Sequence, residues 1–139
     1  LFTPPPSAIP LNAAFNDLAT LRGVTLSPAP LPPGSPTLTA TLVWQAATET
    51  ATSYRVFVHL VDEAGQIVAQ SDGEPAGWTR PTTGWLPGEI ILDDHTLDLT
   101  AVPPGVYQLN IGLYDPVGGG RVPLPDGATA VTIPAITIP

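Results

Sequence analysis

Two histidines are the side chains of this sequence best suited to acid–base chemistry near neutral pH. His59 interrupts an apolar run in YRVFVHLV, and a histidine acting as general base needs an orienting carboxylate and a nucleophile or water molecule. Asp72, on the next apolar run, and His95 are the evident partners. We favour a simpler interpretation, in which His59 lies on the outer face of a strand and hydrogen-bonds a neighbouring loop.

Acidic residues near the second histidine raise the question of metal binding. Asp93, Asp94 and His95, together with Asp72 and Glu74, could supply hard oxygen ligands for calcium. Calcium loops, however, alternate their acids with Gly or Asn, and DDHTLDL lacks that pattern. We therefore expect Asp93-Asp94 to break or bulge a strand, with solvated acids or with Asp side chains that cap turn amides. No metal and no cofactor is expected.

The longest irregular segment, GEPAGWTRPTTGWLPGE (73–89), contains two of the three tryptophans. Trp78, Arg80 and Trp85 could form a carbohydrate platform, with His59, Asp72 and His95 nearby, because sugars stack their C–H faces on indole rings. Alternatively, both rings fold back and close one end of the fold. The two prolines around PTTGWLPGE favour this second role for Trp85, whereas Trp78 suits either role equally.

Sequence signatures of catalysis are missing. There is no GxSxG nucleophile elbow, no phosphate loop, no His-x-x-x-His pair and no pair of catalytic carboxylates at a definable spacing. We expect a protein that is not an enzyme.

The candidate residues must be positioned by strands, because no segment shows a sustained helical period. TLTATLVWQ (37–45) alternates apolar and polar residues, and residues 54–61 and 66–71 flank Asp62-Glu63-Ala64-Gly65 as a hairpin. Seven to nine short strands predict an all-β, antiparallel β-sandwich of the immunoglobulin-like or jelly-roll kind. Tyr107, just after a PG turn, is placed as in a tyrosine corner. We expect a proline-rich extended lead-in at residues 1–12 and a single sandwich domain at 13–139.

Composition narrows the set of partners. The net charge of −8, with four Arg and no Lys, disfavours nucleic acids and anionic membrane surfaces. The absence of cysteine removes disulfides and thiol chemistry. No apolar run is long enough for a transmembrane segment.

The chain termini indicate a further class of function. LFTPPPSAIP and AVTIPAITIP carry no charged residue, so each could add a strand to a neighbouring subunit of a surface filament or homo-oligomer. They could equally be linkers to other domains, or strands of this domain's own sheets.

Four phrases together resemble a known β-sandwich module: TLTATLVWQA, YRVFVHLVDEAGQIVAQSD, RPTTGWLPGEIILDDHTLDL and PPGVYQLNIGLYDP. The module is found in Chloroflexi-type bacteria, often as the extracytoplasmic C-terminal region of membrane glycosyltransferase-like proteins. The resemblance covers about residues 15–124 and implies an extracellular or cell-surface location with a non-catalytic accessory role. The expected function is a structural or interaction module whose partners are neighbouring domains or subunits, or glycans.

Overall fold

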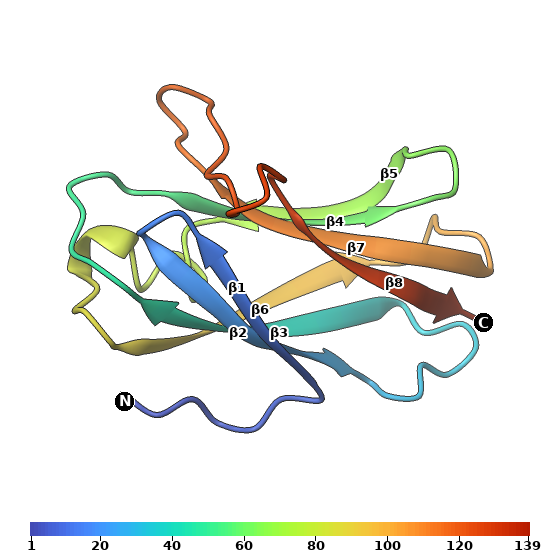
Figure 1. Cartoon of the computed structure of the whole chain (residues 1–139). Helices are drawn as coiled ribbons and strands as arrows, with labels where there is room; N and C mark the ends of the chain where they lie inside the picture. Colours follow the sequence, from blue (N-terminus) through green and yellow to red (C-terminus); the bar gives the residue numbers. More distant parts are fainter.

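The computed structural model describes all residues from 1 to 139 as two antiparallel β-sheets packed face to face (Figure 1). The expected all-β sandwich is therefore confirmed. The strands are β1 (Ile9–Phe15), β2 (Ala19–Ser27), β3 (Thr37–Ala46), β4 (Arg55–Val61), β5 (Ile67–Gly73), β6 (Ile90–Asp98), β7 (Gly105–Tyr114) and β8 (Val131–Ile138), with one short 3-10 helix, η1 (Thr82–Gly84). No helix is long and apolar enough to cross a bilayer.

The strand order identifies the topology. One sheet runs β1-β2-β3-β6 and the other runs β5-β4-β7-β8. With β2 taken as strand A, these orders become A-B-E opposite C′-C-F-G, which is the immunoglobulin-like arrangement, and β1 is an additional strand outside strand A. Of the two sandwich types expected, the immunoglobulin-like one is therefore the one observed.

Alternation along the strands builds the core. In β3, Leu38, Ala40, Leu42 and Trp44 point inward and are buried, as the period of two predicts. Trp44 packs edge-on against Phe15, with ring centroids 5.4 Å apart. The inward residues of the two sheets form one continuous hydrophobic core.

The tyrosine corner is also present. The hydroxyl of Tyr107, near the start of β7, donates a hydrogen bond to the carbonyl of Pro103 at 2.6 Å. Such a bond fixes the connection between β6 and β7, which joins the two sheets at that end.

Both ends of the chain pair within the chain's own sheets. β1 pairs with β2 and already begins at Ile9, inside the segment expected as a lead-in, while β8 pairs with β7. Both are edge strands, and this explains why they tolerate Pro10 and Pro134. Donating either strand to a neighbour would first have to displace these pairings, whereas the outer edge of each strand has no partner in its sheet.

One local expectation is wrong. Asp93-Asp94 neither breaks nor bulges β6, because β3 and β6 pair in continuous register from Thr37↔Asp98 to Gln45↔Ile90. A break is unnecessary because the buried Asp93 finds hydrogen-bond donors in the interior, whereas Asp94 is exposed.

Candidate functional site

The outer face of the β5-β4-β7-β8 sheet carries or borders three of the six candidate residues. Val56, Val58 and Leu60 of β4 are fully buried in the core, so Arg55, Phe57 and His59 point to the opposite face, as the alternation predicts. His59 and Phe57 are nevertheless only 8% and 1% exposed. Their burial shows that side chains from other elements cover this part of the sheet.

Phe57 forms the floor of a shallow depression on this face. Its ring lies over Gly112 of β7, where a Cβ atom would come within 2.4 Å of the ring, so only glycine fits. The guanidinium of Arg121 lies 4.2 Å from the centre of the ring, and the Tyr114 ring is 6.3 Å away. The depression has a volume of about 200 Å³ and is lined by Phe57, His59, Asp72, Tyr114, Gly119 and Arg121.

His59 and Asp72 form the polar wall of the depression. Nε2 of His59 lies 3.5 Å from Oδ1 of Asp72, and the imidazole lies 4.8 Å from the Phe57 ring. Burial lowers the pKa of His59 below its usual 6.5; the Asp72 carboxylate opposes this shift and the Arg121 guanidinium adds to it. Near neutral pH the imidazole is therefore uncharged, and it can both donate and accept hydrogen bonds.

Trp78 lies just beyond the end of β5, at the edge of this sheet and next to Arg55. Its indole is 54% exposed and stacks against Arg55, whose guanidinium carbon lies 4.9 Å from the ring centroid. The indole also packs over Gly73, where an added Cβ would lie 2.8 Å from Nε1. We call Arg55, Phe57, His59, Asp72, Trp78, Tyr114 and Arg121 together the outer-face patch.

The backbone that presents Trp78 is strained. Ala76, Gly77 and Trp78 are three consecutive residues with positive φ angles of 55°, 61° and 70°. Left-handed backbone costs a non-glycine residue about 1–2 kcal/mol, so two of the three positions are unfavourable. The turn is closed by hydrogen bonds from the Trp78 amide to the Glu74 carbonyl at 3.1 Å and from Thr79 Oγ1 to the Ala76 carbonyl at 2.6 Å.

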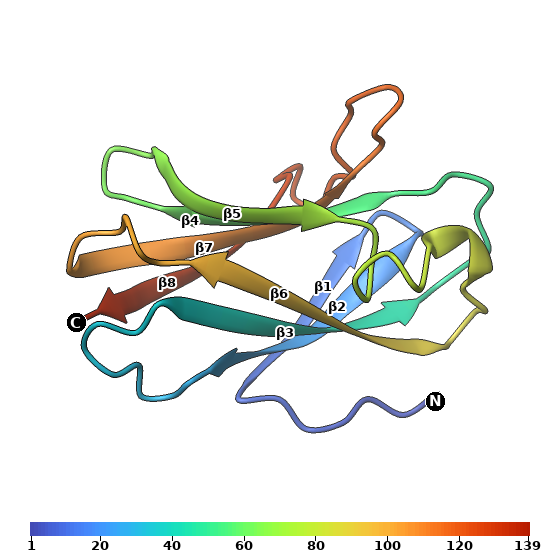
Figure 2. The same ribbon diagram turned by 180° about the vertical axis from the view of Figure 1, so that it is seen from behind.

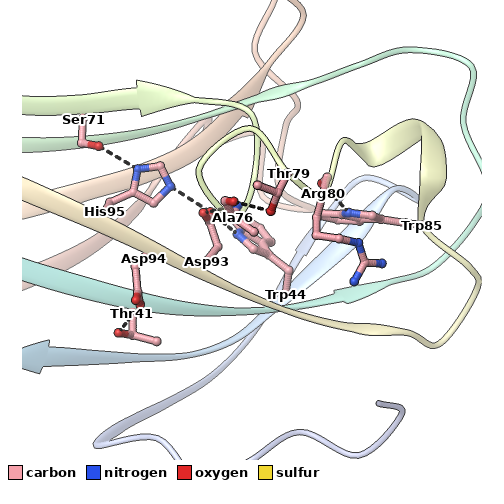
Figure 3. Close-up of polar contacts among 10 residues, drawn as sticks. All are labelled: Thr41, Trp44, Ser71, Ala76, Thr79, Arg80, Trp85, Asp93, Asp94 and His95. Carbon is pink, nitrogen blue, oxygen red and sulfur yellow. Dashed lines mark hydrogen bonds and ion pairs between the residues drawn. The ribbon is translucent and has the colours of Figure 1, made fainter.

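A buried polar network anchors this turn to the interior (Figure 3). Asp93, fully buried on β6, accepts hydrogen bonds from the Ala76 amide at 2.8 Å and from the Trp44 indole at 3.2 Å. Its carboxylate also contacts Nε2 of His95 at 2.8 Å, and Nδ1 of His95 lies 2.9 Å from Oγ of Ser71. The expectation that an Asp of this pair caps a turn amide is thus confirmed for Asp93.

The Ser71–His95–Asp93 order resembles a hydrolytic triad, but its setting differs from that of an active site. Ser71 is the register partner of the fully buried Val58, so its side chain lies on the interior face of β5. His95 is only 4% exposed and Asp93 is completely buried. The chain of bonds therefore spans the gap between β5 and β6, the neighbouring edge strands of the two sheets (Figure 2), and ties them to the turn.

The remaining two candidates lie in the same long loop, apart from the patch. Trp85 is only 2% exposed, and its indole donates a hydrogen bond to the Arg80 carbonyl at 2.9 Å. It therefore closes the end of the sandwich, the second of the two roles considered above. Arg80 forms an ion pair with Glu89 at 2.6 Å.

The structure thus divides the six candidate residues. His59, Asp72 and Trp78 lie on the outer-face patch, whereas Arg80 and Trp85 lie at the end of the sandwich and His95 lies in the interior. Tyr114 and Arg121 were missed. Alternation along β7 could have found Tyr114, because Leu113 before it points inward, but only the folded path of the loop brings Arg121 over Phe57.

The fold and the site define a class: an immunoglobulin-like β-sandwich domain with an aromatic and cationic patch on one sheet face. No protein-family model matches the chain, and no curated protein matches its sequence. The structure contains no group of three or more His, Asp or Glu side chains that could hold a metal ion.

Proposed function

We propose that this chain is a non-catalytic binding module of a bacterial surface or membrane-anchored protein, and that it binds a carbohydrate through the outer-face patch. The observation that carries the proposal is Trp78, an indole left 54% exposed at the tip of a strained turn. Strained backbone persists only where its surroundings enforce it, and it is concentrated at functional sites. Here the enforcing contact is the Asp93–Ala76 hydrogen bond.

The surroundings of Trp78 fit a sugar. Exposed aromatic rings stack on the apolar C–H faces of pyranoses, and the groups beside Trp78 supply hydrogen-bond donors and acceptors for hydroxyls. His59, Asp72 and the Tyr114 hydroxyl provide both kinds of group around the aromatic floor. The depression is shallow, as expected for a module that holds a polymer on its surface.

The location of the module outside the cytoplasm rests on the sequence resemblance described above. The proposal favours binding over filament assembly, because β1 and β8 already have partners in their own sheets. Contacts with neighbouring domains or subunits would use other surfaces of the sandwich.

A glycan array that carries both neutral and acidic glycans tests the proposal. We expect the wild-type protein to bind, and Trp78→Ala to weaken binding by about tenfold, the equivalent of about 1.4 kcal/mol. Leu86→Ala is the matched control, because Leu86 is a similarly exposed apolar residue of the same loop and lies outside the patch. Absence of glycan binding by the wild type, or unchanged binding by a folded Trp78→Ala protein, would contradict the proposal.

A further inference from the structure

Only one of the four arginines forms an ion pair with a carboxylate. Arg80 forms an ion pair with Glu89 at 2.6 Å. Arg22 lies on the β1-β2-β3-β6 sheet and donates a hydrogen bond to the side chain of Gln45 in the same sheet. Arg55 and Arg121 form no ion pair, although the chain has twelve acidic residues. In a chain with a net charge of −8, two guanidinium groups free of carboxylates require an explanation.

Both free arginines belong to the outer-face patch. Arg55 lies over Trp78 at 4.9 Å and Arg121 over Phe57 at 4.2 Å. An aromatic face holds a guanidinium in place by cation–π attraction without neutralising its charge. Each arginine is therefore oriented by a ring while its charge stays available to a ligand.

The two arginines also stand in one row. Arg55 of β4 is the register partner of Tyr114 in β7, and Tyr114 in turn forms a bridge with Arg121. Directly opposed residues of an antiparallel pair project from the same face, so both arginines flank Tyr114. Two strand spacings place their Cα atoms about 10 Å apart.

One donor of this row has no partner. Nε of Arg55 is buried and makes no hydrogen bond within the chain. A buried donor without an acceptor is unfavourable, and an anionic oxygen is the acceptor that a guanidinium binds most strongly. Because Nε itself is inaccessible, an acidic ligand would bind the outer nitrogens of this guanidinium, whose charge is not paired with any carboxylate of the chain.

We propose that the glycan bound by the outer-face patch carries carboxylates, that is, a uronic-acid-containing polysaccharide. Its carboxylates bind Arg55 and Arg121, while a pyranose ring stacks on Trp78. The inference rests on the proposed function and adds the charge of the ligand to it. Asp72 in the patch and the negative remainder of the protein both repel polyanions, so such binding depends on the two arginines.

Calorimetric titration of the wild-type protein with three uronic-acid-containing polysaccharides tests this inference: polygalacturonate, alginate and hyaluronan. Each is paired with its carboxyl-esterified form, which has the same backbone without the charge. We expect at least one acidic polymer to bind at least tenfold more tightly than its ester, and this binding to weaken as NaCl rises from about 50 to 500 mM. Dextran sulfate, which carries sulfates but no uronic acid, is included to separate carboxylate from sulfate recognition, and we expect weaker binding to it.

Two variants assign the binding to the row of arginines. Arg121→Gln, a substitution at an exposed position, should weaken polyuronate binding about tenfold or more. Arg22→Gln removes the same charge from the other sheet and should leave the affinity unchanged. Equal binding of acids and esters, tightest binding to dextran sulfate, or equal effects of the two substitutions would overturn the inference. Binding of neutral glycans alone would overturn it while leaving the proposed function intact, whereas failure of every glycan to bind would overturn both.

Discussion

His59 occupies an electrostatic setting unlike that of a histidine in solvent. Burial lowers its pKa below 6.5, against the effect of Asp72 and in the same direction as Arg121. Since the folded state resists protonation more than the unfolded chain does, the unfolded chain binds more protons as pH falls below 6.5. The stabilisation associated with neutral His59 is therefore complete above pH 6.5 and is lost as pH falls through the lowered pKa.

Replacing His59 by Gln should remove this pH dependence. We expect the free energy of unfolding of the wild type to fall between pH 7.5 and pH 5.5, and that of His59→Gln to fall less. Urea unfolding at several pH values measures both, and the two curves should run parallel above pH 7.5, where neither state is protonated. Equal slopes between pH 7.5 and 5.5 would show that His59 does not titrate as described. Glu89 titrates outside this window, because hydrogen bonds from Leu86 and Arg80 hold its pKa below 4.5.

At the level of single residues, the sequence predicted orientation better than contact. Alternation correctly placed His59 beside Arg55 and Phe57 on the outer face of β4. It could not show that Arg121, more than sixty positions further along the chain, would cover Phe57. Nor could it show that Asp93 would face the Trp44 indole, because that contact depends on the β3–β6 register.

A hydrogen bond to Asp93 links the left-handed turn at residues 74–78 to strand β6. The turn carries two non-glycine residues with positive φ, and the Asp93 carboxylate holds it through the Ala76 amide. The same carboxylate satisfies the Trp44 indole and contacts His95. Removing it leaves buried donors without an acceptor, which is among the most destabilising changes that a core can undergo.

Asp93→Ala should therefore lower the free energy of unfolding by about 3–5 kcal/mol, because the Trp44 indole, the Ala76 amide and the His95 ring would lose their partner, at about 1–3 kcal/mol for each buried group left unsatisfied. Asp94→Ala is a matched control one residue away, because Asp94 is exposed and bonds only Thr41 on the surface. Its effect should stay within about 0.5 kcal/mol. Chemical denaturation measures both variants, and similar losses for the two would refute the anchoring role of Asp93.

Secondary structure was predicted correctly where apolar and polar residues alternate regularly. It was predicted wrongly where polar residues occupy inward-facing positions. The β3 strand and the β4–β5 hairpin follow directly from alternation, and Gly65 adopts the expected positive φ of 81° in the turn. In β6 the same period continues through Asp93 and His95, but polar residues at inward positions suggested a bulge. The compensating donors come from β3, β5 and the long loop, which local sequence does not reveal.

At the scale of the whole molecule, the two sheet faces differ in chemistry. The outer face of the β1-β2-β3-β6 sheet carries threonines and acids, with hydrogen bonds between Thr39 and Thr96 and between Thr41 and Asp94. The opposite outer face carries the aromatic floor and the two unpaired arginines, one of which lies against the exposed indole of Trp78. This asymmetry supports binding on one face, and it arises from side chains on top of a fold that many unrelated functions share.

The most direct test of binding at the outer-face patch uses the three indole N–H resonances of the 14.4 kDa chain. The tightest-binding polyuronate, as a short oligosaccharide, is titrated into ¹⁵N-labelled protein. We predict that the Nε1–H signal of exposed Trp78 shifts with the ligand, whereas those of Trp44 and Trp85 stay in place because Asp93 and the Arg80 carbonyl hold them inside. An unmoved Trp78 signal, with shifts confined to amides of the β1-β2-β3-β6 sheet, would contradict the proposed site.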